Sequence, residues 1–254
     1  MAVKYYGLNQ VHAATITAST ESAQFPLTNL QDDRRTKVYR STSNSDTMVI
    51  DFGQAVDIDA FCIVDNPMLG FALSTLTVEL NATNSWGSPA VSQAITLDQT
   101  YGWGAYEWAT TQNYRFARLV MTSTTGYCEI SKIYLGPKSA PGALDFTYPL
   151  TFEQKTNCTI SENRYGQKFV DDINTQKIVG GEIQHLYKDE LDSLLELFDY
   201  TSVTRPMFIT FDATAMFETN NNRINGYYYL NKSPQYSYQT GNMWSLKLTF
   251  EEGT

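Results

Sequence analysis

Residues 114–121 read YRFARLVM, and this stretch favours β structure over helix. Its two arginines alternate with Phe116 and stand among small or apolar residues, so one face of an extended strand can be buried while the other stays wet. Similar short runs, separated by turn residues, recur through the first half of the chain at the spacing of a β-sandwich. They lie at residues 14–18, 37–40, 48–52, 58–64, 76–80, 93–97, 114–121 and 129–135.

A break in composition follows at residues 136–142, whose sequence GPKSAPG holds two prolines and two glycines. Such a segment propagates neither a β-ladder nor a helix. We therefore expect one β-sandwich domain over residues 1–136, a linker over 137–142 and a second, mainly β domain over 143–254. Strand-like segments of the second domain lie at residues 167–170, 177–184, 207–211, 226–230 and 244–250.

The second half also contains one convincing helical pattern, over residues 187–198. Apolar side chains recur there at positions 187, 191, 194, 195 and 198, which is the stripe of an amphipathic helix. Carboxylates at positions 189, 190 and 192 crowd its first turns, where the partial positive charge of a helix N-terminus stabilises them. We expect this helix to lie across a sheet, in a chain that is mainly β overall.

The bulk composition is that of a globular protein. Hydrophobic residues make up 42% of the 254 positions and charged residues 18%, which is enough apolar surface for two packed cores. The formal charge of −9, from 18 basic and 27 acidic residues, argues against nucleic acid as a partner, because phosphate binding needs a clustered basic surface.

The cysteines and the N-terminus favour a reducing compartment. Cys62, Cys128 and Cys158 are few, odd in number and without CxxC spacing, so we expect buried free thiols and neither a disulfide framework nor a zinc site. No segment has the apolar core of a signal peptide, and no stretch approaches the roughly 18 apolar residues of a membrane helix. We expect synthesis in a cytoplasm and no insertion into a membrane.

The chain is poor in catalytic groups, since His12 and His185 are its two histidines. Both are expected to be structural, and we predict no catalytic residue, no metal, no cofactor and no enzyme activity. The carboxylate pairs Asp171-Asp172 and Glu251-Glu252 could suggest a glycan hydrolase. Neighbours in a strand point to opposite faces, however, so each pair is better interpreted as solvated surface.

An aromatic cluster supplies the candidate contact residues. Tyr101, Trp103 and Tyr106 lie close together in sequence among glycines, with Trp86 upstream and Trp108 just beyond. Aromatic side chains in such a loop can pack in the core, anchor a protein partner or stack on a sugar ring. We predict ligand or partner contact for Trp86, Tyr101, Trp103 and Tyr106, with core packing as the open alternative.

Five segments of the first half resemble the discoidin, or galactose-binding-like, family. They are residues 18–22, 26–32, 47–53, 117–121 and 129–136, and they occur in the family's order. The resemblance implies a jelly-roll β-sandwich. The paired cysteines of many extracellular members are missing, and Tyr39-Arg40-Ser41 stands in place of the usual Trp-Ser step.

In that family a loop around the second of these segments sometimes holds calcium through backbone carbonyls and a carboxylate. The resemblance would place the ligands here at Asn29, Asp32 or Asp33, and Thr36. The neighbouring Arg34 and Arg35 oppose a cation electrostatically.

The opening ASTESAQFPLTNLQD (residues 18–32) is similar to discoidin-type modules in tail and baseplate proteins of long-tailed bacteriophages. The element order of residues 143–254, with an aromatic, acid-tipped last strand, is similar to tail-tube, distal-tail and minor-tail proteins. These resemblances imply a structural component of the virion tail that assembles as a three- or six-fold ring with other tail proteins. The alternative is a carbohydrate-binding module for attachment to a host glycan, with the four aromatic residues as its stacking platform.

Overall fold

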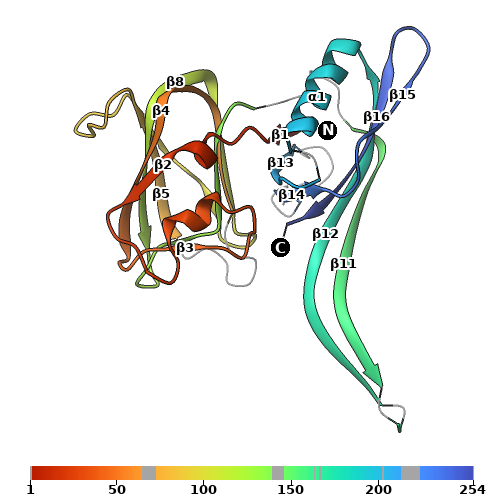
Figure 1. Cartoon of the computed structure of the whole chain (residues 1–254), viewed down its shortest axis with the longest axis horizontal. Helices are drawn as coiled ribbons and strands as arrows, with labels where there is room; N and C mark the ends of the chain where they lie inside the picture. Colours follow the sequence, from red (N-terminus) through yellow and green to blue (C-terminus); the bar gives the residue numbers. More distant parts are fainter. Residues whose placement is uncertain are drawn as a thin grey trace.

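The structure is a computed structural model that describes residues 2–64, 73–138, 146–162, 164–165, 167–201, 203–212 and 224–253. In these residues it contains two seven-stranded antiparallel sheets, a small two-stranded sheet and one α-helix (Figure 1). The predicted class, mainly β with a sandwich and one amphipathic helix, is confirmed. No described helix is long and apolar enough to cross a membrane.

The first sheet curls into the sandwich. Its strand order is β10-β4-β8-β5-β6, with β2 paired to β4 and β7 to β8, while β3 and β9 form the small sheet. The strands are β2 (Thr15–Ala18), β3 (Tyr39–Arg40), β4 (Ser45–Val64), β5 (Leu73–Asn81), β6 (Val91–Ala94), β7 (Leu97–Asp98), β8 (Trp103–Ser123), β9 (Glu129–Ile130) and β10 (Lys132–Gly136), with 3-10 turns η1 (Gln10–Ala13) and η2 (Leu27–Gln31).

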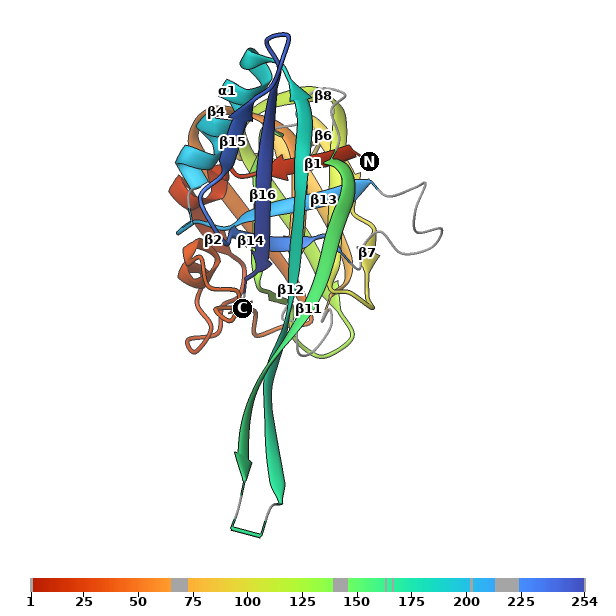
Figure 2. The ribbon, with the colours of Figure 1, turned by 90° about the vertical axis from the view of Figure 1, so that its right-hand side faces the viewer.

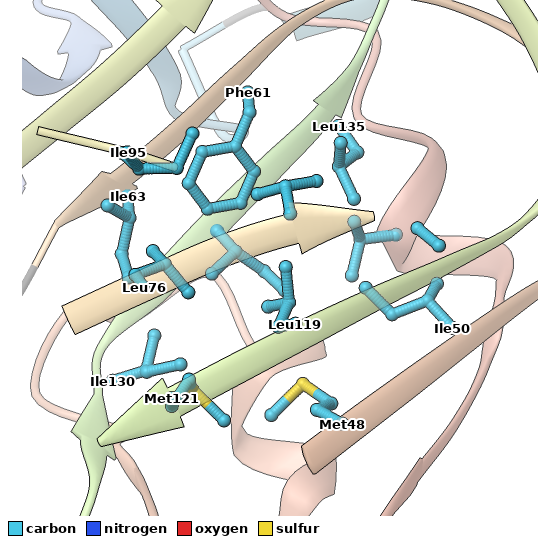
Figure 3. Packing of buried hydrophobic residues seen from close by; sticks show 14 of the residues in the cluster. Met48, Ile50, Phe61, Ile63, Leu76, Ile95, Leu119, Met121, Ile130 and Leu135 are labelled. Atoms are coloured by element: carbon cyan, nitrogen blue, oxygen red, sulfur yellow. The ribbon is translucent and has the colours of Figure 1, made fainter. Parts of the chain in front are cut away.

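The long strands β4 and β8 each run through both layers of the sandwich. Their pairing shifts register between Asp51 and Val56, where Gly53 adopts a positive φ of 78°, and again between Ile58 and Ala60. Such irregularities bend a ladder and change which side chains face inward. The segments predicted at 48–52 and 58–64 are therefore parts of one strand, and both contribute to one core. Figure 3 shows that core, with labelled side chains Met48, Ile50, Phe61, Ile63, Leu76, Ile95, Leu119, Met121, Ile130 and Leu135.

The second sheet has the order β1-β13-β14-β16-β12-β11, with β15 paired to β16. Its first strand comes from the very start of the chain, since Ala2 pairs with Asp212 and Tyr6 with Phe208. Residues 2–6, expected with the sandwich, thus belong to the sheet of the second half. The division at 137–142 otherwise stays a prediction, and residues 139–142 lie outside the described part. The strands are β1 (Ala2–Tyr6), β11 (Phe146–Glu162), β12 (Lys168–Leu186), β13 (Met207–Asp212), β14 (Gly226–Leu230), β15 (Gln235–Tyr238) and β16 (Trp244–Glu252).

Helix α1 (Lys188–Thr201) covers one face of this sheet, as predicted from the stripe at 187–198. Its buried residues Leu191, Leu194, Leu197 and Phe198 pack in one cluster with apolar side chains of β1, β12, β13, β14 and β16. The Glu190 carboxylate accepts a hydrogen bond from the backbone N–H of Tyr187 at 2.9 Å, which satisfies a donor at the helix start.

Strands β11 and β12 extend far beyond the body as a two-stranded ribbon (Figures 1 and 2). The pairing of β12 with β16 covers residues from Leu186 to Ile178, and from residue 177 to 168 the described pairing of β12 is with β11 alone. We call residues 151–177 the arm. The sequence predicted two short strands at 167–170 and 177–184, and none at 146–162. Residues 153–156 are polar and exposed and give no apolar alternation, although apolar residues do alternate at positions 146, 148, 150 and 152.

Substitution of Tyr5 tests whether β1 belongs to the hydrophobic core of the second sheet. Its ring is buried and lies 5.7 Å from Phe198 and 6.0 Å from Phe250 between ring centroids. Tyr5→Ala should lower the free energy of unfolding by about 3–5 kcal/mol in urea titration, because it removes a buried ring.

Tyr5→Phe is the matched control. The Tyr5 hydroxyl is buried and has no hydrogen-bond partner among the described residues. Its removal should leave stability equal or slightly higher. An unchanged midpoint in Tyr5→Ala would contradict the placement of β1.

Candidate functional site

The outer face of one sandwich layer is apolar and packs on the second sheet. In β8, Trp103, Ala105 and Glu107 point toward the second sheet, whereas Tyr106 and Trp108 point to the sandwich core. The neighbouring strand β4 is also buried on both faces at residues 58–64, which explains the nearly continuous apolar run there. The cluster between the two sheets, called the interface cluster below, contains Tyr6, Ala60, Cys62, Val64, Trp103, Tyr134, Phe208 and Tyr227, with Ala105 at its edge.

Trp103 is therefore a packing residue. Its side chain is 3% exposed, and its ring centroid lies 5.8 Å from that of Phe208. The ring is not available as a stacking surface in this conformation. Tyr106 is half-buried on the opposite face of the strand, where its ring contacts Trp108 edge-on at 5.4 Å.

Trp86 and Tyr101 lie in loops of the sandwich. The guanidinium of Arg118 lies over the Trp86 ring at 4.7 Å, and the Trp86 indole N–H donates to Asn84 Oδ1 at 2.7 Å. The Tyr101 backbone N–H donates to the Asp98 carboxylate at 3.1 Å in the β7–β8 turn. The four predicted contact residues do not form one surface, and a contact role for half-buried Trp86 and Tyr101 stays a prediction.

Charged groups flank the interface cluster, and sequence reasoning did not single them out. Lys4 Nζ and the Tyr6 hydroxyl, both on β1, donate to Glu107 Oε1 on β8 at 2.8 and 2.6 Å. Lys138 Nζ reaches the other Glu107 oxygen at 3.2 Å. Burial works to raise the pKa of Glu107, but the hydrogen bonds from Lys4 and Tyr6 outweigh it and lower that pKa, so the carboxylate stays charged.

The loop where some discoidin-like proteins hold calcium is filled here by a lysine. Lys132 on β10 is 2% exposed, and its Nζ donates to the backbone carbonyls of Asn29 and Lys37 at 2.6 and 2.8 Å. The Asp32 carboxylate, another expected ligand, accepts from the Arg34 guanidinium at 2.9 Å. Of the ligands that the resemblance would place here, the Asn29 carbonyl is therefore already bonded to an ammonium group and the Asp32 carboxylate to a guanidinium.

Burial lowers the pKa of Lys132 to about 8, and the nearby carboxylates of Asp32 and Asp33 offset part of that effect. At neutral pH the group is still mainly a cation. It supplies positive charge and hydrogen-bond donors to the loop, as a metal ion would supply charge and coordination.

The remaining chemistry of the described residues is sparse. They contain no group of three or more His, Cys, Asp or Glu side chains that could hold a metal. His12 Nδ1 lies 3.8 Å from an Asp33 oxygen, and burial lowers the pKa of its imidazole. Cys62 and Cys128 are buried free thiols, as predicted, while the side chain of Cys158 lies outside the described residues.

A pocket of about 500 Å³ opens where the β7–β8 turn meets β13. Its polar side chains already take part in the fold: the Gln99 amide donates to the carbonyl of Leu73 at 2.9 Å, and Asn225 Oδ1 accepts from the Phe211 N–H at 2.7 Å. The pocket is lined by Thr96, Leu97, Asp98, Gln99, Trp103, Ala105, Thr210 and Asn225.

No family model and no curated protein matches this sequence. Solved structures of carbohydrate-binding modules are similar to about half of the chain. A family 32 module from Clostridium perfringens, in complex with GalNAc-β-1,3-galactose, has a TM-score of 0.43 and 10% identity, covering 51% of this chain and 99% of that module. A Streptococcus pneumoniae fucose-binding module has a TM-score of 0.44 and 12% identity, covering 51% and 97%.

A Ruminococcus gnavus GH29 fucosidase has a TM-score of 0.46 and 15% identity, with coverage of 53% of this chain and 28% of that enzyme. At such identities and TM-scores, none of these similarities assigns a ligand or an activity to this chain.

The Lys132 ammonium gives a direct electrostatic test. Titration followed by NMR of the lysine side chains should show one group with a pKa of about 8, absent in Lys132→Met. The folded chain then binds fewer protons than the unfolded chain between pH 8 and the ordinary lysine value of 10.5, so the free energy of unfolding due to this group rises with pH in that window. A Lys132 that titrates at or above 10.5 would contradict its burial in the loop.

Proposed function

We propose that this chain is a structural subunit that assembles with further copies of itself through its arm. The observation that carries the proposal is the ribbon of β11 and β12, in which residues 154–162 and residues 168–177 have described pairing only with each other. An isolated two-stranded ribbon is marginally stable in water, and its open edges are templates for another strand. Phe152, near the root of the arm, is 38% exposed.

The opposite end of the second sheet offers a surface for such a contact. Strand β15 has described pairing with β16 alone, and its Tyr236 and Tyr238 are 56% and 61% exposed. Both rings lie against Trp244, at centroid distances of 6.1 and 5.3 Å. Aromatic side chains of this kind are common anchors of protein interfaces.

The arm and the β15 edge lie at opposite ends of the sheet (Figures 1 and 2). The arm of one copy cannot reach the β15 strand of the same copy. A contact between the arm and β15 therefore joins two copies head to tail. Head-to-tail contacts between identical subunits close into rings or continue as filaments. The likeness of the sequence to phage tail and baseplate proteins makes a three- or six-fold ring in the tail of a virion the assembly we propose, with other tail proteins as partners.

Sedimentation of the full chain tests this proposal. The wild-type protein should sediment as a multimer. A variant in which Asn-Gly replaces residues 156–175 should sediment as a monomer with an unchanged thermal midpoint, because Lys155 and Gln176 face each other in the ribbon and can flank a two-residue turn.

Two further variants sharpen this experiment. Tyr236→Ser combined with Tyr238→Ser should weaken the multimer, because both rings belong to the proposed acceptor surface. Thr110→Asp, on an exposed position of the sandwich, should leave the multimer intact. A wild-type chain that stays monomeric at every concentration tested, or a shortened chain that still assembles, would refute the role of the arm.

Glycan binding by the sandwich is the second candidate function. The half-buried Trp86 indole, held over Arg118 in the loop after β5, is the aromatic surface that favours it. Galactose, N-acetylgalactosamine and fucose glycans form a sensible first panel, because solved modules of similar fold are in complex with or bind such sugars. Binding of the full chain to an array, lost in Trp86→Ala and kept in Thr110→Asp, is the expected result. If no glycan on the array binds the chain, glycan binding by the sandwich is ruled out.

A further inference from the structure

We propose that residues 29–37 form a latch that fixes the sandwich to the root of the arm, and that Lys132 supplies the cation of this latch from within the chain. The latch is a property of the single chain. Its consequence for assembly, a fixed direction of the arm, rests on the proposed function.

The inner side of the latch faces the sandwich. Lys132 Nζ joins the carbonyl oxygens of Asn29 and Lys37, which lie at the two ends of the segment. The Asn29 amide also donates to the carbonyl of Val38 at 2.8 Å, and the Ser131 hydroxyl donates to the carbonyl of Arg35. One buried ammonium therefore closes the segment into a loop of defined shape.

The outer side of the latch faces the second sheet. The Arg35 guanidinium donates to Glu252 Oε1 at 2.8 Å, and the two side chains are only 5% and 9% exposed. The carbonyl of Asp33 accepts from the Tyr229 hydroxyl at 3.1 Å. A buried charge pair depends on geometry, because an ion that loses its partner in a low-dielectric site is strongly unfavourable. Arg35 reaches Glu252 only while the loop keeps its shape.

Glu252 also holds the root of the arm. Lys177 Nζ lies 3.2 Å from Glu252 Oε1, and the backbone N–H of Lys177 donates to Oε2 at 3.3 Å. The next residue, Ile178, is the last residue of β12 that pairs with β16, so Lys177 marks the point where the arm leaves the sheet. A single carboxylate thus joins Arg35 of the sandwich to Lys177 of the arm.

Hydrogen–deuterium exchange of the full chain tests the latch. In Lys132→Met the carbonyls of Asn29 and Lys37 lose the ammonium donor, so amide exchange should rise about tenfold or more in residues 29–37 and also around 174–178. In Glu252→Gln the rise should appear at the same two places. Strand β5, far from the latch in the sheet order, should be unchanged in both variants.

Arg34→Gln is the matched control, because Arg34 is exposed and pairs with Asp32 on the surface of the same loop. Its exchange pattern should follow the wild type within about twofold. A rise confined to residues 29–37 in Lys132→Met, or no change at the arm root in Glu252→Gln, would overturn the latch. If Lys132→Met does not fold, Glu252→Gln decides alone.

Added calcium tests whether the Lys132 ammonium group or a bound metal ion holds the loop at residues 29–37. Added calcium chloride or EDTA should leave the exchange of residues 29–37 unchanged in the wild type, because the ammonium already occupies the carbonyl oxygens. Protection that depends on calcium would overturn the role of Lys132. Sedimentation of the same samples reads assembly separately, so a failed latch and a failed assembly give different signals.

Discussion

The packing of the interface cluster is the constraint on which the rest of the structure depends. A β-sandwich ordinarily buries one face of each layer, but here β4, β8 and β10 carry apolar side chains on both faces. Without a cover, Cys62, Trp103 and Tyr134 would form an exposed apolar patch. Tyr6, Phe208 and Tyr227 of the second sheet supply that cover, so the two halves of the chain share a buried surface.

This shared surface limits which parts of the second sheet stay open to other contacts. One of its faces is covered by α1 and the other by the sandwich, so the open parts of the sheet are its ends: the arm and the β15 hairpin. Strand β1 strengthens the arrangement, because Val3 and Tyr5 face the helix while Lys4 and Tyr6 face the sandwich. A sheet covered on both faces gives the arm a fixed root, which the proposed assembly through the arm requires.

Local patterns in the sequence predicted the elements but not their partners. The alternation at 114–121 and the stripe at 187–198 correspond to β8 and α1, since both patterns arise from one buried face. Strand β1 was not predicted because its partner is more than 200 residues away. Strand β11 was not predicted although apolar residues alternate at 146, 148, 150 and 152, since the polar, exposed residues 153–156 interrupt that pattern. The roles of Trp103 and Lys132 depend on their tertiary neighbours. The sequence suggested Trp103 as a contact residue, but its ring packs between the two sheets. Nothing in the sequence indicated the role of Lys132, whose ammonium group fills the loop at residues 29–37.

Electron cryo-microscopy of the purified chain tests the central proposal, that the two packed halves hold the arm in position for a neighbouring copy. We expect rings or filaments in which the arm of each copy adds strands to the β15 edge of the next. Single particles with free arms, or assemblies in which the arm contacts no neighbour, would contradict it.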